Sequence, residues 1–232
     1  TIVAAVEQGR MIFDNIRKFI KYLLACNSGE LWVMLWGLLM GMPLPLLPIQ
    51  ILWMNLVTDG LPALALGVEP AEKDIMHRAP YPPGEGIFGR HVGRDIIWLG
   101  ILMGLASLGV GYIYWQAGEA AWQTMLFTTL TFSQISLAMT IRSERVSLFT
   151  IGLLTNKALL AAVGLSTLLH LGVVYLPFMQ AIFETETLSA RDLSVTLAIS
   201  TVGFWGYEAQ KWFARKRGHN GAVTPSRDPS AR

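Results

Sequence analysis

The sequence has 232 residues, of which 53% are hydrophobic and only 15% are charged, whereas soluble domains average about 25% charged residues. The net charge of +2 gives no indication of nucleic-acid binding, and a single cysteine, Cys26, excludes a disulfide framework within the chain. The apolar residues are gathered in blocks of about 20, the length that a helix needs to cross the hydrocarbon core of a bilayer. The composition therefore indicates an integral membrane protein.

The beginning of the chain has apolar residues at helical spacing. Ile2, Val6, Ile12 and Ile16 fall on one face, so residues 1–18 are predicted to form a cytoplasmic stalk helix that continues into the membrane. Six membrane helices are then expected, at 19–41, 48–67, 94–115, 121–141, 157–178 and 192–212. The predicted fold class is therefore an all-α membrane protein, a six-helix transmembrane bundle over residues 19–212.

The links between the expected helices differ in charge. A long polar loop occupies 68–93, and the basic tail at 213–232 becomes rich in Gly, Pro and Ser, which predicts disorder. Of the 18 Lys and Arg residues, all but Arg191 fall on one side of the six-helix arrangement. The positive-inside rule then places both termini in the cytoplasm. Lys is scarce, whereas Arg, Trp and Gly are abundant, and this composition favours a bacterial source. In a bacterium the membrane would be the plasma membrane.

Polar residues lie inside the first two expected membrane helices. Asn27 and Glu30 are three residues apart, and Asn55, Thr58 and Asp59 also share one helix face. A charge at the centre of a bilayer costs at least about 2.5 kcal/mol, so something must offset the burial of the two acids. Because a tight turn joins the two helices, they are antiparallel neighbours whose polar faces can meet.

The second helix also contains a helix breaker. Pro62 lacks the N–H that would bond the carbonyl of Thr58, and Gly60 is adjacent. We therefore expect the helix to be broken near Gly60–Pro62. Irregular backbone at membrane depth is tolerated where it lines a cavity, and broken helices supply carbonyl oxygens to ions in transporters.

The donor atoms in these two helices are almost all oxygens. Two carboxylates, two amides, a hydroxyl and a freed carbonyl are expected at one depth, and such oxygen sets suit hard cations, whereas zinc and copper favour His and Cys. A protonated Glu–Asp relay is an open alternative, and an isolated Asn or Thr in a membrane helix is often only an interhelical hydrogen bond. The pattern favours a cation or proton site over structural pairing.

Three segments resemble a known family. TIVAAVEQGR at 1–10, CNSGE at 26–30 and WMNLVTDGLPALALG at 53–67 resemble type II P-type ATPases, in particular calcium pumps of the sarcoplasmic-reticulum type. The six expected helices then correspond to the last six of that family's ten. Asp74 and Arg78 also match the family's cytoplasmic loop, which is thought to couple the membrane helices to the phosphorylation domain.

The resemblance implies metal-ligand roles for individual residues. Asn27, Glu30 and Thr58 match ligands of the first of two calcium sites. Asn55 matches a ligand of the second site, and Asp59 matches the carboxylate that bridges both.

One position departs from the family pattern. An alignment pinned on Ser143 and Glu144 places Gln134 where the two-calcium pumps have a glutamate. The amide keeps an oxygen but loses a charge, so the resemblance leaves open one calcium per cycle. An ordinary helix–helix hydrogen bond is the other reading of Gln134.

The sequence contains no DKTG, TGE or GDGxND motif, so no catalytic residue is expected in it. The resemblance implies a fragment whose parent chain carries the actuator, phosphorylation and nucleotide-binding domains, with ATP and Mg²⁺ bound there. Its partners are then the lipid bilayer and the transported cation, which is Ca²⁺, exported in exchange for protons. The alternatives are a P-type pump for Mn²⁺ or Na⁺, a secondary cation/proton exchanger, or a non-transporting scaffold, which leaves Glu30 and Asp59 unexplained.

Overall fold

The computed structural model describes residues 1–72, 75–77, 86, 88–89, 92–143 and 146–220, and every regular element among these residues is a helix. The helices are, in chain order, α1 (Ile2–Leu39), α2 (Pro48–Trp53), the π-helical η1 (Met54–Thr58), α3 (Gly60–Gly67), α4 (Val92–Gln116), α5 (Trp122–Thr140), α6 (Leu148–Ile151), the 3₁₀-helical η2 (Leu153–Thr155), α7 (Lys157–Tyr175), α8 (Pro177–Phe183), α9 (Ala190–Ser200) and α10 (Val202–Asn220). The predicted all-α class is confirmed.

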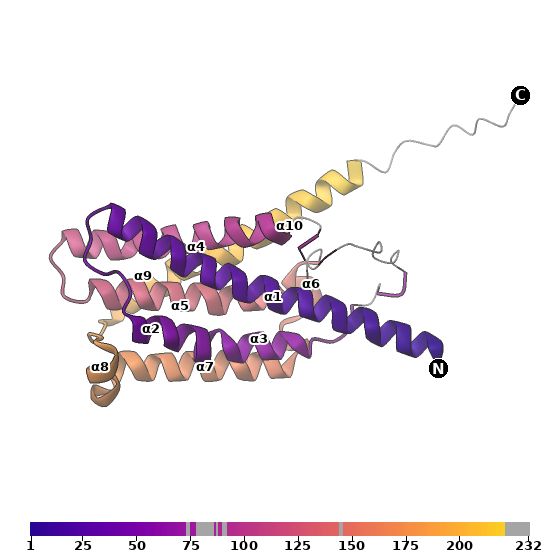
Figure 1. Ribbon diagram of the computed structural model, residues 1–232, viewed down its shortest axis with the longest axis horizontal. Coiled ribbons are helices and arrows are strands. Elements are labelled where there is room, and N and C mark those ends of the chain that lie inside the picture. Colours follow the sequence, from indigo (N-terminus) through magenta and orange to yellow (C-terminus); the bar gives the residue numbers. More distant parts are fainter. Residues whose placement is uncertain (73–74, 78–85, 87, 90–91, 144–145, 221–232) are drawn as a thin grey trace, which may run out of the picture.

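The long helices lie side by side along one axis and form an elongated bundle (Figure 1). The N-terminus and α6 lie at one end, which we call the stalk end, and α10 extends beyond the bundle in the same direction. The opposite end, called the hairpin end, contains α8 and the links between α1 and α2 and between α4 and α5. Within the bundle α4 packs against both α1 and α5, while α7 packs against α3 and α5.

Among the described residues, three stretches are long and apolar enough to cross a membrane, at Pro48–Gly67, Val92–Gln116 and Lys157–Tyr175. They correspond to three of the six expected spans, and the count of six stays a prediction. The stalk and the first expected span form the single 38-residue helix α1. The last expected span is divided, because α9 ends at Ser200 and α10 begins at Val202.

The break in the second span differs from the expected one. The irregular segment is the π-helical turn Met54–Thr58, and a regular α-helix resumes at Gly60 rather than unwinding between Gly60 and Pro62. Asp59 N–H donates to the carbonyl of Met54 at 2.8 Å, a bond that spans five residues. The missing N–H of Pro62 therefore coincides with a widened turn on its N-terminal side, and π-helical turns of this kind are frequent at functional sites.

The expected disordered tail also needs correction at its start. Helix α10 continues through 213–220, so this part of the tail is helical. Residues 221–232, and with them the rest of the predicted disorder, fall outside the described residues. The loop-motif residues Asp74 and Arg78 fall outside them too, as does Glu144.

Small residues bring α1 and α4 close together. An added Cβ at Gly104 would lie 2.9 Å from the carbonyl oxygen of Gly29, and one at Gly100 would lie 3.0 Å from the Gly29 nitrogen. Such glycine contacts let the backbones of membrane helices approach closely. The contact lies one residue from Glu30, so it fixes the position of that carboxylate within the bundle.

Candidate cation site

Glu30 lies at the centre of a group of polar side chains from three elements. Its Oε2 accepts a hydrogen bond from Asn55 Nδ2 at 2.9 Å, and its Oε1 accepts one from Gln134 Nε2 at 3.1 Å. Glu30 belongs to α1, Asn55 to η1 and Gln134 to α5. Glu30 and Gln134 are buried, and Asn55 is partly buried. The structure thus brings together three of the residues that the sequence nominated.

The second carboxylate, Asp59, is fully buried at the start of α3. Its Oδ1 accepts a hydrogen bond from the Tyr22 hydroxyl at 3.4 Å, a weak contact, and Asp59 and Glu30 are close enough to interact electrostatically. Thr58, the neighbouring residue, donates its hydroxyl to the carbonyl of Met54 at 3.1 Å. Both carboxylates therefore belong to one buried site.

The π-helical turn determines how η1 presents these groups. The Nδ2 atom of Asn55 bonds the carbonyl of Ile51 at 3.0 Å as well as Glu30, so the amide is held against its own helix and turned toward α1. The widened turn ends at Thr58, so Asp59 follows it directly. In a regular α-helix Asn55 and Asp59 would lie one turn apart on a fixed face, whereas the extra residue of the π-turn changes their relative orientation.

Two acceptor oxygens of the site have no hydrogen-bond partner among the described residues. They are Asp59 Oδ2 and Gln134 Oε1, and both are buried. Buried polar atoms are nearly always paired, so an unpaired pair of acceptors at one site calls for a bound species that the protein atoms do not supply. Within the described residues no Lys or Arg pairs with Glu30 or Asp59.

The expectation that oxygen donors hold a cation here stays a prediction. Among the described residues no three His, Cys, Asp or Glu side chains gather closely enough to hold a metal ion by themselves. Any cation here would instead use the two carboxylates together with amide and hydroxyl oxygens, which is the preference of hard cations.

Asn27 is not brought to the site. Its side chain is exposed, and its Nδ2 donates to the carbonyl of Leu23 on its own helix at 2.8 Å. The neighbouring residue Cys26 is buried instead and contacts Asp59. Tyr22, Cys26 and Glu30 follow one another at intervals of four and form the buried face of α1. That spacing in the sequence could have identified Tyr22 and Cys26.

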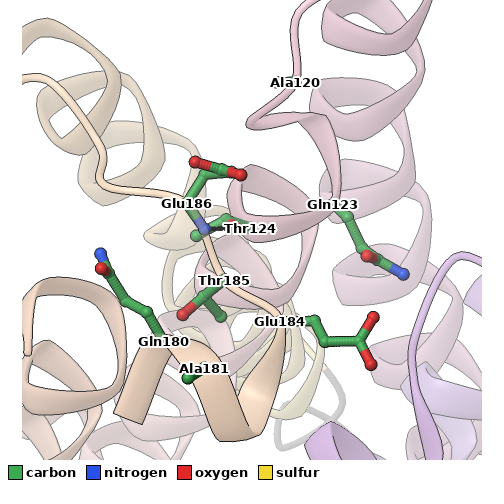
Figure 2. Close-up of a pocket in the computed structure, with 8 residues that line it drawn as sticks. All are labelled: Ala120, Gln123, Thr124, Gln180, Ala181, Glu184, Thr185 and Glu186. Carbon is green, nitrogen blue, oxygen red and sulfur yellow. Dashed lines mark hydrogen bonds between the residues drawn. The ribbon is translucent and has the colours of Figure 1, made fainter. Parts of the chain in front are cut away.

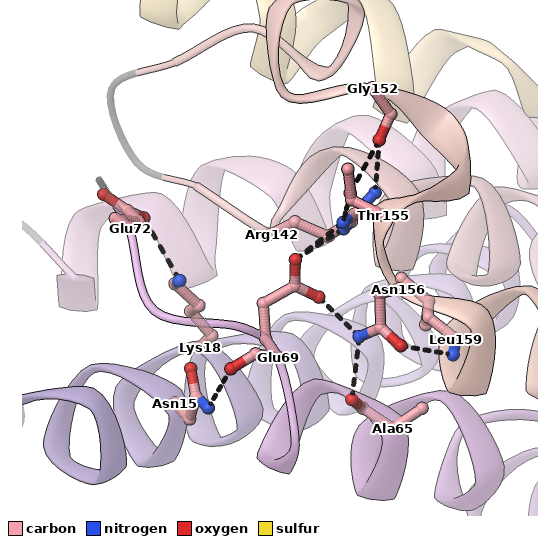
Figure 3. A network of polar contacts seen from close by, with 10 residues as sticks. All are labelled: Asn15, Lys18, Ala65, Glu69, Glu72, Arg142, Gly152, Thr155, Asn156 and Leu159. Carbon is pink, nitrogen blue, oxygen red and sulfur yellow. Dashed lines mark hydrogen bonds and ion pairs between the residues drawn. The ribbon is translucent and has the colours of Figure 1, made fainter. Parts of the chain in front are cut away.

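A polar network at the stalk end holds the helix that carries Asp59. We call it the Glu69 junction, and Figure 3 shows it with Glu69 at its centre. Glu69 Oε1 accepts hydrogen bonds from Arg142 Nε at 2.9 Å and Nη2 at 2.7 Å, and Oε2 accepts one from Asn156 Nδ2 at 2.6 Å. The carbonyl of Glu69 accepts a bond from Asn15 of α1 at 2.8 Å.

The Glu69 junction connects four helices. Asn156 also caps the start of α7, where its Oδ1 accepts the backbone N–H of Leu159, and its Nδ2 bonds the carbonyl of Ala65 in α3. Arg142 follows the end of α5 and is only 1% exposed. The position of α3 relative to α1, α5 and α7 is therefore fixed by a buried ion pair and its hydrogen bonds.

A second buried ion pair joins α1 to α4 and α10. Lys21 Nζ lies 2.7 Å from Asp95 Oδ2 and donates to the hydroxyl of Tyr207 at 2.8 Å. Buried charges are retained where they are paired, and the positive charge of Lys21 is neutralised by Asp95 rather than by Glu30 or Asp59. In the part of the chain that the structure describes, Glu30 and Asp59 have no such partner.

Comparisons with known proteins agree on one family. The family model described as "Cation transporting ATPase, C-terminus" matches residues 43–213. The chain is 45% identical over 205 residues to the calcium-transporting ATPase of Bacillus subtilis (strain 168), an alignment covering 87% of this chain and 23% of the relative. It is 36% identical to calcium-transporting ATPase 1 of Yarrowia lipolytica, over 95% of this chain and 24% of the relative.

A further relative is the calcium-transporting ATPase type 2C member 1 of Pongo abelii, 34% identical over 87% of this chain and 22% of the relative. The chain therefore spans about a quarter of the length of the curated relatives that it matches. Because the family model covers most of the chain, the protein belongs to the cation-transporting ATPase family, of which it contains the C-terminal region.

Proposed function

We propose that this chain is the membrane transport region of an ATP-driven P-type pump whose cargo is Ca²⁺. The observation that carries the proposal is the pair of buried carboxylates, Glu30 and Asp59, which accept hydrogen bonds from amide N–H groups and a tyrosine hydroxyl and have no Lys or Arg partner among the described residues. The names of the relatives, all calcium-transporting ATPases, support calcium as the cargo.

The proposed ligands are Glu30, Asn55, Thr58, Asp59 and Gln134. Asn55 and Gln134 now direct their amide N–H groups at Glu30, and rotation of each amide would offer the carbonyl oxygen instead. A cation entering the site would thus replace two hydrogen bonds to Glu30 by direct contacts. Asn27 lies outside this set because its side chain points away from Glu30.

The charge of the ligand set supports one calcium per cycle. Two carboxylates balance one divalent cation, and Gln134 contributes an oxygen without a third negative charge. When the cation leaves, the emptied carboxylates are buried without a counter-charge, which favours their neutralisation by protons. We therefore include proton counter-transport in the proposal.

The rest of the proposal concerns the parent protein. Six spans with both termini in the cytoplasm place the stalk end inside the cell, in keeping with its concentration of Lys and Arg. ATP and Mg²⁺ would be bound by actuator, phosphorylation and nucleotide-binding domains elsewhere in the parent chain. The Arg-rich composition supports the plasma membrane of a bacterium as the location.

The deciding experiment measures phosphoenzyme formation from ATP by the full-length parent in membranes. Calcium, manganese and sodium are each titrated in the presence of magnesium, with the Asp59→Asn variant beside the unsubstituted protein. We expect labelling that requires micromolar calcium and is lost in Asp59→Asn. Glu119→Gln, which changes an exposed acid at the hairpin end, is the matched control and should label normally.

Labelling that responds to manganese or sodium but ignores calcium would contradict the cargo assignment. An Asp59→Asn protein that retains the full calcium response would contradict the site, because this substitution removes one of its two charges. The count of bound calcium per phosphoenzyme, measured with radioactive calcium, tests the proposed stoichiometry of one.

A further inference from the structure

Three polar side chains between α5 and α7 are fully buried and have no hydrogen-bond partner among the described residues. They are Thr128, Ser166 and His170, and neither ring nitrogen of His170 is paired. A neutral imidazole has one N–H to donate and one nitrogen that accepts, so His170 leaves both capacities unused.

The unpaired hydroxyl of Thr128 is not a general property of α5. The nearby hydroxyls of Thr129, Thr131 and Ser133 each bond a carbonyl four residues earlier in the helix, at 2.7, 2.9 and 2.7 Å. Thr128 has the same local option and makes no such bond. Its hydroxyl is therefore directed away from its own helix.

The three side chains share one interface. The ring of His170 packs edge-on against Phe127 and Phe132 of α5, with centroids 4.8 and 5.5 Å away. Thr128 follows Phe127 and lies one turn before Phe132, which places it on the face that meets His170. Ser166 is four residues from His170 and lies on the same face of α7. We call Thr128, Ser166 and His170 the α5–α7 cluster.

A cavity of about 560 Å³ opens at the hairpin end, between the start of α5 and the segment 180–186. Its polar lining residues are Gln123, Thr124, Gln180, Glu184, Thr185 and Glu186. Figure 2 shows the acids Glu184 and Glu186 around Thr124 and Thr185. The two threonines are buried.

Both helices place the cluster one turn below this cavity. On α5, Thr124 lines the cavity and Thr128 lies four residues deeper, about 5.4 Å along the axis. On the other side, the Thr185 hydroxyl donates to the carbonyl of Val173 at 2.7 Å, and His170 precedes Val173 by three residues.

The polar face of α5 continues from the cluster toward the cation site. Thr131 is three residues beyond Thr128, and Gln134 is three residues further and bonds Glu30. Thr124, Thr128 and Thr131 recur at intervals of four and three, which keeps them on one face of the helix. A line of hydroxyl groups thus runs from the acidic cavity to the neighbourhood of Glu30.

We propose that the α5–α7 cluster binds buried water molecules and, with the acidic cavity above it, forms an aqueous access route from the hairpin end toward the cation site. Buried waters typically make about three hydrogen bonds to otherwise unpaired groups, and the cluster supplies two hydroxyls and two ring nitrogens. An apolar cavity would stay dry, whereas this interface is polar on both helices. The role of the route in releasing the cation rests on the proposed function, but its hydration does not.

The test uses the full-length parent in sealed vesicles and a small, cationic, membrane-impermeant thiol reagent added at the hairpin-end side. Ser166→Cys and Thr128→Cys are compared with Leu168→Cys, which lies at a similar depth on α7 but is 68% exposed on the outer surface of the bundle, facing lipid under the proposed topology. The unsubstituted protein, with its buried Cys26, gives the background.

We expect Ser166→Cys and Thr128→Cys to be modified at least tenfold faster than Leu168→Cys. When Glu184→Gln and Glu186→Gln are added to these cysteine variants, modification by the cationic reagent should be slowed severalfold. Modification by an uncharged reagent should be unaffected. Two variants on different helices are used so that the failure of one to fold leaves the other to decide, and folding is checked by gel filtration.

Modification of both cysteines no faster than that of Leu168→Cys would overturn the proposal. The result is independent of transport, because labelling does not require ATP. If the parent forms a calcium-dependent phosphoenzyme, His170→Leu should leave the calcium dependence of its formation unchanged and slow the decay of the phosphoenzyme severalfold. His77→Leu, in the exposed loop, should not slow this decay. Failure of calcium-dependent phosphoenzyme formation in every variant would refute the proposed function. The result of the cysteine modification would still stand.

Discussion

Glu30 is held by amides rather than by a positive charge, and this difference separates it from the buried acids Glu69 and Asp95. Glu69 is bonded by Arg142 and Asp95 by Lys21, so each of these acids is already neutralised within the protein. The hydrogen bonds from Asn55 and Gln134 orient the Glu30 carboxylate but leave its charge uncompensated. A residue of this kind is suited to receive a mobile cation and to lose it again.

The role of Gln134 can be tested by changing its charge. Gln134→Leu removes both the donor to Glu30 and the unpaired Oε1, so we expect calcium affinity to fall about tenfold, the equivalent of ~1.4 kcal/mol. Gln134→Glu restores an oxygen and adds a charge, so it should bind calcium at least as tightly as the unsubstituted protein, since ligand charge tunes calcium affinity. The measurement is the calcium dependence of phosphoenzyme formation by the parent.

Gln116→Leu, at an exposed position of α4, is the control for Gln134→Leu and should leave the affinity unchanged. Equal affinities for the Leu and Glu variants at position 134 would show that Gln134 is a packing residue. In that case its bond to Glu30 would be an ordinary contact between helices.

The sequence predicted most of the residues of the candidate site but not the face of α1 that contributes to it. Charged and amide residues in apolar stretches are costly, so Glu30, Asn55 and Asp59 are conspicuous in the sequence. Asn27 and Cys26 are adjacent, and helical spacing from Glu30 permits either one to lie near it. The structure selects Cys26, because the buried face of α1 is set by its packing against α3 and α4.

At the scale of elements, the close contact of α1 and α4 positions Glu30 relative to α5. Gly29 on α1 faces Gly100 and Gly104 on α4, and α5 packs against both α4 and α1. The distance from Glu30 to Gln134 therefore depends on how closely the two backbones approach. A side chain at this contact would displace α4 without touching any proposed ligand.

Gly104→Ala should weaken calcium binding through this displacement. The new Cβ would lie 2.9 Å from the backbone oxygen of Gly29, a contact that side-chain rotation cannot relieve. We expect a fall in calcium affinity of about 3–10-fold and a lower unfolding temperature in detergent. Gly109→Ala on the same helix has no atom within 4 Å of the new Cβ and should match the unsubstituted protein in both measurements. Identical behaviour of the two variants would argue against the proposed positioning.

The irregularity of the second span illustrates what a single sequence can predict about an element. Pro62 and Gly60 predict that the hydrogen-bond ladder is interrupted, because proline has no N–H to offer. They do not determine how the neighbouring residues compensate. The structure compensates with a π-helical turn at Met54–Thr58, whose bonding depends on how Asn55 and Asp59 fit against α1.

At the scale of the whole molecule, three positive side chains among the described residues pair with acids from distant parts of the sequence. Lys18 pairs with Glu72 at 3.1 Å, Lys21 with Asp95, and Arg142 with Glu69. Hydropathy alone predicts the approximate place of the apolar helices, because apolar blocks and polar links are local features. The buried ion pairs join residues that are between 54 and 74 positions apart in the sequence. Their partners could therefore not be predicted from the sequence without the fold.

The Glu69 junction should be a main determinant of stability, because it ties α3 to α1, α5 and α7. Removing one member of a buried ion pair leaves the other charge without compensation, which costs about 3–5 kcal/mol. Arg142→Met and Glu69→Leu are each expected to lower the free energy of unfolding by this amount. The double variant should cost far less than the sum, because two apolar side chains replace a pair whose desolvation was itself unfavourable.

This double-mutant cycle is measured by denaturant unfolding of the parent in detergent, with Arg94→Ala as the control. Arg94 is 66% exposed and lies 3.6 Å from Asp95, whose charge stays paired with Lys21, so the loss of the Arg94 side chain should change the free energy of unfolding by less than about 1 kcal/mol. Additive losses in the double variant would mean that Glu69 and Arg142 stabilise the protein separately. Strong non-additivity would instead establish the junction as one unit, whose integrity holds Asp59 at the depth where Glu30 meets Asn55 and Gln134.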